Sequence, residues 1–221
     1  MATLKIGHRG AKGHVAENTL ESIKKAMLLK VDMIEIDVHL CKTGELVVIH
    51  DEELGNTTSG NGVVSDKSLA QIKSFRTKEG YQIPTLSEVL ELIQDKVILN
   101  IELKGEGTAE PVLKCLQKFP ESKILISSFS FNELMSLRSW NPEIPVAVLT
   151  ENDLSMAFLQ ARHLKAFSIH PYYKMVTRDF IADCHRNDIK VYVWTVNKPE
   201  KIKKLKSLDV DGIFSDFPDR L

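Results

Sequence analysis

Short apolar runs alternate along most of the chain with longer stretches whose apolar residues recur at helical spacing. Several of these runs are nearly continuous, which is typical of parallel strands covered on both faces. Eight such strands are predicted at residues 4–8, 33–38, 97–103, 124–127, 146–149, 166–169, 191–196 and 212–214. Seven helices are predicted between them at residues 19–29, 86–93, 108–119, 131–140, 153–163, 177–187 and 199–207. This order indicates repeated β-α-β units on one parallel sheet.

Polar side chains at the strand ends decide between a barrel and an open sheet. They occur at five ends: His8-Arg9, Glu35-x-Asp37, Glu102-x-Lys104, Ser127-Ser128 and Trp194-x-x-Asn197. A doubly wound sheet would gather them at one switch point, whereas a barrel spreads its chemistry over the carboxyl ends of several strands. We therefore predict one domain over residues 1–221, an α/β fold of the (β/α)8 TIM-barrel type.

One segment interrupts the alternation after the second strand. Residues 47–50 resemble a short extra strand, and residues 51–84 are rich in Gly, Asn, Ser and Thr. The segment is too irregular for a separate domain, so we predict a short insertion placed as a loop over the barrel mouth.

Composition limits the partners. Against 29 Lys and Arg stand 30 Asp and Glu, a net charge of −1, so the chain has no sequence-wide field for nucleic acid or an anionic membrane. The three cysteines are far apart, which predicts neither disulfides nor a zinc site. No apolar stretch is long enough for a signal peptide or a membrane span. We expect a cytoplasmic protein without stable membrane association or nucleic-acid binding; the sequence leaves its oligomeric state open.

Three carboxylates are predicted to converge. Glu35 and Asp37 lie two apart on one strand, so they share a face, and Glu102 repeats the arrangement on the next barrel strand. Burying like charges together is costly unless a cation neutralises them. One reading is that they only form ion pairs with Arg9 and Lys104. Three carboxylates together favour the other reading, a site for one hard divalent cation, Mg²⁺ or Ca²⁺, in which Arg9 and Lys104 hold phosphate oxygens.

Two of the seven histidines differ from the rest by their context. His8 ends the first strand and His50 ends the short extra strand, beside Arg9 and Asp51. Cleavage of a phosphoester needs one group to take a proton and another to give one, and two histidines can divide that work at neutral pH. The other five are interpreted as surface or core residues: His14, His39, His163, His170 and His185.

Several ordered motifs resemble those of the glycerophosphodiester phosphodiesterase family. They are His8-Arg9-Gly10, Glu17-Asn18-Thr19, Glu35-Ile-Asp37-Val-His39-Leu with Thr43-x-x-x-x-Val48-x-His50-Asp51, Asn100-x-Glu102-x-Lys104, Trp194-Thr-Val196-Asn197 and Asp211-Gly212-Ile-x-Ser215-Asp216. These motifs span nearly the whole chain in order, and such a combination is highly specific.

The resemblance implies a (β/α)8 barrel and assigns roles to residues. It implies acid/base catalysis by His8 and His50. The implied metal ligands are Glu35, Asp37 and Glu102, the phosphate-binding residues are Arg9 and Lys104, and the supporting residues are Glu17, Asn18 and Asp51. Trp194 is either a wall for the glycerol moiety or a core tryptophan. Which histidine is the acid stays open, as does the nucleophile, water or the substrate's own hydroxyl.

The implied reaction is metal-dependent hydrolysis of a glycerophosphodiester, a small molecule of lipid and glycerol metabolism, to an alcohol and glycerol 3-phosphate. Ala16 departs from the family pattern, in which proline is usual, and predicts a less rigid loop. The short insertion resembles that of compact cytoplasmic, bacterial-type members. Two alternatives are a lysophospholipase D-like lipid phosphodiesterase and a non-catalytic barrel that binds phosphate esters.

Overall fold

The computed structural model describes residues 3–221 and contains the eight predicted strands and seven predicted helices. The strands are β1 (Leu4–Gly7), β2 (Met33–Leu40), β3 (Leu46–Val48), β4 (Ile98–Leu103), β5 (Ile124–Ser128), β6 (Val146–Thr150), β7 (Ser168–Pro171), β8 (Lys190–Val193) and β9 (Gly212–Ser215). The helices are α1 (Leu20–Leu28), α2 (Leu69–Ser74), α3 (Leu86–Ile93), α4 (Ala109–Leu116), α5 (Phe131–Trp140), α6 (Leu154–Leu164), α7 (Arg178–Arg186) and α8 (Pro199–Lys206).

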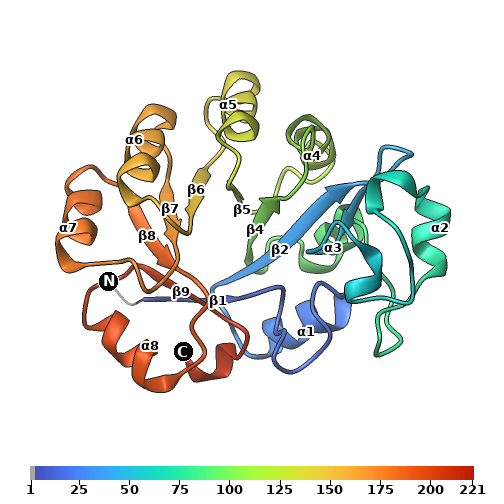
Figure 1. The fold of residues 1–221 in the computed structure, drawn as a ribbon, viewed down its shortest axis with the longest axis horizontal. Helices are drawn as coiled ribbons and strands as arrows, with labels where there is room; N and C mark the ends of the chain where they lie inside the picture. The colour runs from blue at the N-terminus through green and yellow to red at the C-terminus, as the bar shows by residue number, and fades with distance from the viewer. Residues whose placement is uncertain (1–2) are drawn as a thin grey trace.

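Eight of these strands form a closed parallel barrel. The order runs β1-β9-β8-β7-β6-β5-β4-β2, and a parallel pairing of β1 with β2 closes the circle. The remaining strand, β3, pairs antiparallel with β2 on the outside. Figure 1 shows the helices arranged around this barrel, with α2 at the edge of the molecule and α3 in contact with β3. The prediction of a TIM barrel is confirmed.

Strand alternation separates two apolar layers. Residues that point outward pack against the helices in a large cluster that includes Ile34, Ile36 and Ile101. Residues that point inward form a smaller cluster of Ile6, Met33, Leu125, Ala147, Tyr192 and Phe214. Because side chains alternate along a strand, Glu35 and Asp37 continue the inward row that begins at Met33. The barrel interior is therefore apolar at its base and polar at its mouth.

Most helices begin at a residue that caps the free backbone N–H groups of the first turn. Thr19, Ser130, Asp153 and Thr177 each accept a hydrogen bond from the backbone two or three residues into the helix. Thr85 forms a full capping box with Glu88. Such caps stabilise a helix by about 1 kcal/mol, and they explain why the predicted helix starts agree with the structure. Within residues 3–221, no helix is both long and apolar enough to cross a membrane.

The insertion after β2 differs from the prediction in two ways. Residues 51–84 contain the helix α2 and two 3₁₀ turns, Leu54–Asn56 and Val64–Asp66, where only loop was expected. Leu54, Val64 and Ile72 form a small apolar core of their own with β3. The insertion lies beside β2 (Figure 1), and the cavity at the barrel mouth has no lining residue from this segment. It is a packed side element and not a loop over the mouth.

Candidate active site

The carboxyl ends of the barrel strands surround a cavity of about 410 Å³, within the range of small-molecule sites. Its lining residues are His8, Arg9, Glu35, His50, Asn100, Glu102, Lys104, Phe129, Leu149, Glu151, His170, Trp194, Thr195 and Phe214. Seven of the eleven residues predicted for the site are among them. Asp37, Glu17, Asn18 and Asp51 do not line the cavity, but each contacts a residue that does.

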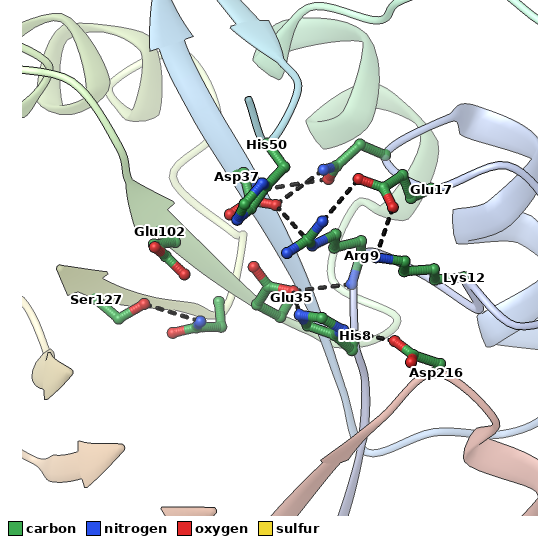
Figure 2. Close-up of polar contacts among 12 residues, drawn as sticks. His8, Arg9, Lys12, Glu17, Glu35, Asp37, His50, Glu102, Ser127 and Asp216 are labelled. Atoms are coloured by element: carbon green, nitrogen blue, oxygen red, sulfur yellow. Dashed lines mark hydrogen bonds and ion pairs between the residues drawn. The ribbon is translucent and has the colours of Figure 1, made fainter. Parts of the chain in front are cut away.

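The three predicted carboxylates converge at the mouth (Figure 2). Glu35, Asp37 and Glu102 can each offer one oxygen such that all three oxygens lie within 4.8 Å of one another. All three residues are buried, and the register of β2 with β4 places Asp37 directly beside Glu102. The Oε1 of Glu35 is buried without a hydrogen-bond partner among the described residues. Acidic oxygens in this arrangement fit a hard divalent cation.

Burial and mutual repulsion disturb the protonation of this cluster. Burial, and then the charge of Asp37, raises the pKa of Glu35 well above its ordinary value. The same two causes raise the pKa of Glu102 to about 7. Burial acts to raise the pKa of Asp37, but the nearby cationic groups, Arg9 foremost, and the hydrogen bond from Asn18 together outweigh burial and lower that pKa. The three adjacent carboxyl groups repel one another when all are ionised. A bound cation would offset that repulsion.

A tight turn after β1 places Arg9 against the cluster. Arg9 and Gly10 both have left-handed backbone conformations, with φ of 50° and 84°. The turn aims the Arg9 backbone N–H at the Oε2 of Glu35, 2.8 Å away. A Cβ on Gly10 would lie 2.4 Å from the Oγ of Ser22, so the close approach to α1 requires glycine there. The turn thus fixes the distance between β1 and the carboxylates of β2.

The Arg9 side chain is held from two sides. Its guanidinium contacts Glu17 at 2.7 Å and Asp37 at 3.3 Å. Asn18, which also has a left-handed backbone, donates from Nδ2 to Asp37 over 2.9 Å. Glu17 in turn pairs with Lys12 at 2.7 Å. The predicted supporting residues Glu17 and Asn18 therefore position the Arg9 guanidinium and the Asp37 carboxylate.

Lys104 lies between a carboxylate and a histidine. Its ammonium is 3.0 Å from the Oε1 of Glu102 and 3.3 Å from the Nε2 of His50. Burial acts to lower the pKa of Lys104, but the charges of Glu102 and Asp37 outweigh it and raise that pKa. Lys104 therefore stays cationic. The ion pairs that the sequence suggested for Arg9 and Lys104 are formed. Both side chains also line the cavity, where a ligand could contact them.

Each histidine of the predicted pair has its own carboxylate. The Nδ1 of His8 donates to Asp216 and the Nδ1 of His50 donates to Asp51, both over 2.6 Å. In the view of Figure 2 the carboxylates of Glu35 and Asp37 lie between the two imidazoles. The Nε2 of His8 is 4.0 Å from the Oε2 of Glu35. Burial lowers the pKa of His8, although the bond to Asp216 opposes this. Both rings therefore turn their Nε2 atoms away from these aspartates, and the Nε2 of His50 lies 3.3 Å from the Lys104 ammonium. His50 lies two residues beyond the end of β3 and does not end that strand.

Sequence reasoning missed two residues that position His8. Asp216, which directly follows β9, also accepts from the Nδ2 of Asn197 over 2.7 Å. The Oδ1 of Asn197 accepts from the backbone N–H of Asp216 and from the hydroxyl of Ser215. The available signal is that Asp216 directly follows a strand, as the predicted site residues do. The motif that contains Asp216 predicts no partner for His8.

Two histidines interpreted as ordinary lie close to the site. His39 contacts the backbone carbonyl of His50 over 3.0 Å, so it helps to hold that segment. His170 is fully buried in β7, where its Nε2 bonds Ser168 over 2.9 Å and its carbonyl accepts from the Nε1 of Trp194 over 2.7 Å. Trp194 lines the cavity and is partly buried.

Comparison with known proteins agrees with this geometry. The model of the glycerophosphoryl diester phosphodiesterase family matches residues 8–220. A glycerophosphodiester phosphodiesterase of Caldanaerobacter subterraneus subsp. tengcongensis is 38% identical, over 100% of this chain and 97% of its own length. A phosphodiesterase of Oleispira antarctica, solved in complex with its product sn-glycerol-3-phosphate, superposes with a TM-score of 0.91 at 31% identity, covering 97% of this chain and 93% of that one.

A human lysophospholipase D is also related, at 26% identity over 98% of this chain and 84% of its own. The family match covers nearly all of the barrel, including every residue predicted for the site. The chain therefore belongs to the glycerophosphoryl diester phosphodiesterase family, a family of phosphoric diester hydrolases.

Proposed function

We propose that this protein hydrolyses glycerophosphodiesters to an alcohol and glycerol 3-phosphate with the help of one divalent cation, Mg²⁺ or Ca²⁺. One observation carries the proposal: a single cavity is lined by two histidines, two cations and the buried carboxylates of Glu35 and Glu102. A phosphodiester needs each of these, since its charge must be neutralised and two protons must move.

The carboxylate cluster supports the metal part of the proposal. Glu35, Asp37 and Glu102 would hold the cation, because their oxygens approach within 4.8 Å and the Oε1 of Glu35 has no other partner among the described residues. When bound, the cation would polarise a phosphoryl oxygen and neutralise charge in the transition state. All-oxygen ligands favour Mg²⁺ or Ca²⁺ over softer metals.

Arg9 and Lys104 are proposed to orient the phosphate. Glu17 and Asp37 hold the Arg9 guanidinium in one plane, while Glu102 holds the Lys104 ammonium at the cavity wall. A guanidinium binds two oxygens at once and an ammonium acts as a point charge, so the pair fixes the scissile bond against the histidines. Trp194 would form a wall for the glycerol moiety, consistent with its position in the cavity lining.

His8 and His50 are proposed to move the two protons. Because Asp216 and Asp51 accept from the Nδ1 atoms, proton transfer would use the Nε2 atoms, of which that of His50 lies beside the Lys104 ammonium. One Nε2 takes the proton of the nucleophile, and the other gives a proton to the leaving alkoxide oxygen. The same geometry serves an attacking water or a hydroxyl of the substrate's own glycerol.

The test is release of glycerol 3-phosphate from glycerophosphocholine by the purified protein, with Mg²⁺, with Ca²⁺ and with a chelator. We expect metal-dependent product from the wild type and none from His8→Ala or Glu35→Ala. His14→Ala is the matched control, because His14 also pairs with an aspartate but lies outside the cavity. Folded protein that releases no product with either metal would refute the proposed substrate.

A lipid phosphodiesterase is the second candidate, and the relationship to a human lysophospholipase D favours considering it. Against it, five of the cavity's fourteen lining residues carry charged side chains, in addition to three histidines. Hydrolysis of lysophospholipid micelles at a rate comparable to glycerophosphocholine would establish it. We further propose a cytoplasmic location, in accord with the three unpaired cysteines of the described residues, Cys41, Cys115 and Cys184.

A further inference from the structure

The cavity has a second side, across the barrel from the histidine and arginine of β1. Starting from β1, β6 is reached after four strands in either direction around the barrel. The residues that line the cavity on this far side are Phe129, which directly follows β5, and Leu149 and Glu151 at the end of β6. β5 and β6 are paired neighbours. The chemistry described above uses none of these three residues.

Glu151 differs from the other carboxylates of the cavity. Glu35 accepts the backbone N–H of Arg9, and Glu102 pairs with Lys104. Glu151 is exposed and makes no side-chain hydrogen bond or ion pair with any residue of 3–221. It therefore gives the far side of the cavity an uncompensated negative charge, across the barrel from Arg9 and two strands from Lys104.

An aromatic side chain lies next to this charge. Phe129 is 45% exposed, high for a phenylalanine, and it meets the ring of Trp194 edge to face with 5.8 Å between centroids. The Lys104 ammonium lies 5.9 Å from the centroid of Phe129. Phe129 thus lies near Lys104 on one side, and it follows the strand that neighbours β6, which Glu151 follows. Aromatic faces attract cations that are poorly hydrated, and quaternary ammonium groups above all.

We propose that Glu151 and Phe129 form a subsite for a cationic alcohol moiety, so that esters of amino alcohols such as choline and ethanolamine are preferred over esters of neutral alcohols. This inference rests on the proposed function and names the substrate class within it. In such esters two methylene groups separate the ester oxygen from the nitrogen. A phosphate on Lys104 therefore places the ammonium beside Phe129 and toward Glu151, with the glycerol against Trp194.

The experiment compares kcat and KM for glycerophosphocholine and glycerophosphoethanolamine with those for glycerophosphoglycerol, whose alcohol is neutral. Glu151→Gln keeps the shape of the side chain and removes its charge. We expect kcat/KM for both cationic esters to fall about threefold to fivefold, the size of a solvent-accessible ion pair. The change should lie in KM, because the subsite is distant from the reacting atoms. Glycerophosphoglycerol should be unaffected.

Two further variants sharpen the comparison. Phe129→Leu should lower kcat/KM for glycerophosphocholine more than for glycerophosphoglycerol, because it removes the aromatic face and keeps an apolar side chain. Glu143→Gln is the matched control, because Glu143 is an exposed glutamate that precedes the opposite end of the same strand, β6. Glu143→Gln should leave kcat/KM unchanged for all three esters. The preference for cationic esters should also decrease as salt is added, since screening weakens an exposed charge pair.

The outcomes separate the subsite from the reaction. Equal effects of Glu151→Gln on cationic and neutral esters, or no effect on either, would overturn the subsite and leave the proposed function intact. If the wild type hydrolyses none of the three esters, binding of glycerophosphocholine by calorimetry decides. Binding that weakens in Glu151→Gln would retain the subsite without the reaction, and binding that is absent or unchanged would overturn it.

Discussion

The Nδ1 of His8 donates to the Oδ1 of Asp216 over 2.6 Å, although 208 residues separate the two in the chain. The bond joins the residue after β1 to the residue after β9, two strands that pair in parallel. It exists because the barrel closes, bringing the first and last strand ends together at the mouth. Burial acts to raise the pKa of Asp216, but the hydrogen bonds from His8 and Asn197, with nearby positive charge, together outweigh burial and lower that pKa. The aspartate therefore stays ionised and sets the tautomer of His8.

Asp216→Asn is expected to lower kcat at least about tenfold while leaving the fold intact, because an amide can stabilise the wrong tautomer of the imidazole. The measurement is steady-state hydrolysis of glycerophosphocholine across pH. Asp219→Asn provides a matched control, since Asp219 bonds His14 over the same 2.6 Å outside the cavity. Equal rates for the two variants would contradict a positioning role for Asp216.

Glu35→Gln is expected to have opposite effects on stability with and without metal. In chelator, the variant should unfold at a higher temperature than the wild type, because it removes one of three clustered carboxylates. With Mg²⁺ or Ca²⁺ added, only the wild type should gain stability, by about 3 kcal/mol when the free ion reaches roughly 100 times its dissociation constant.

Thermal unfolding followed by circular dichroism, with and without metal, measures both effects. Glu143→Gln serves as the control for loss of one carboxylate outside the cluster, and it should respond to metal as the wild type does. A wild-type protein whose stability does not change with either ion would show that the cluster holds no metal.

The barrel could be predicted from the sequence because a local pattern of residues indicates each strand and each helix. Apolar runs, caps such as Thr85, and polar residues at strand ends all act over a few residues. That Glu35 and Asp37 share one face of their strand also follows from strand alternation alone, whereas the inward direction of that face does not. Each of these features depends on residues that are close together in the sequence. They can therefore be found without knowing that the barrel closes.

Features that depend on pairs distant in the chain were not predictable. The bond of His8 to Asp216 requires knowing which strands neighbour each other, and the contact of Phe129 with Trp194 requires their relative height at the mouth. The sequence predicts only loop in the insertion, because α2 is short, only six residues. Its apolar contacts are with β3 and its neighbours and not with the barrel interior. Tertiary packing, more than local propensity, makes that segment helical.

Arg9→Lys is expected to lower kcat/KM by at least about tenfold, because one ammonium cannot replace a fork that contacts Glu17 and Asp37 and still reach the phosphate. The charge is conserved, so any loss reports geometry. Hydrolysis of glycerophosphocholine is measured alongside Arg162→Lys, an exposed position on α6. Wild-type kinetics in Arg9→Lys would mean that Arg9 contributes only its charge.

His170, which also lines the cavity, predicts a pH dependence of stability. The residue is fully buried and stacks on Tyr192 with 5.3 Å between ring centroids. Burial lowers its pKa from an ordinary value near 6.5 to about 3. Between these two values the unfolded chain binds a proton that the folded protein does not. The free energy of unfolding therefore falls as the pH falls through that window.

His170→Gln removes this titration and keeps a polar partner for the Ser168 hydroxyl. Lost packing should make the free energy of unfolding of the variant lower than that of the wild type at pH 7. This difference should shrink by about 2 kcal/mol between pH 7 and pH 5. Only the wild type loses stability in this range, because its unfolded chain takes up a proton on His170. Urea denaturation at both pH values, in chelator, gives the two differences. His163→Gln, on the exposed face of α6, controls for the loss of a histidine from the surface. A difference between wild type and His170→Gln that is the same at both pH values would mean that His170 binds its proton as readily in the folded protein as in the unfolded chain.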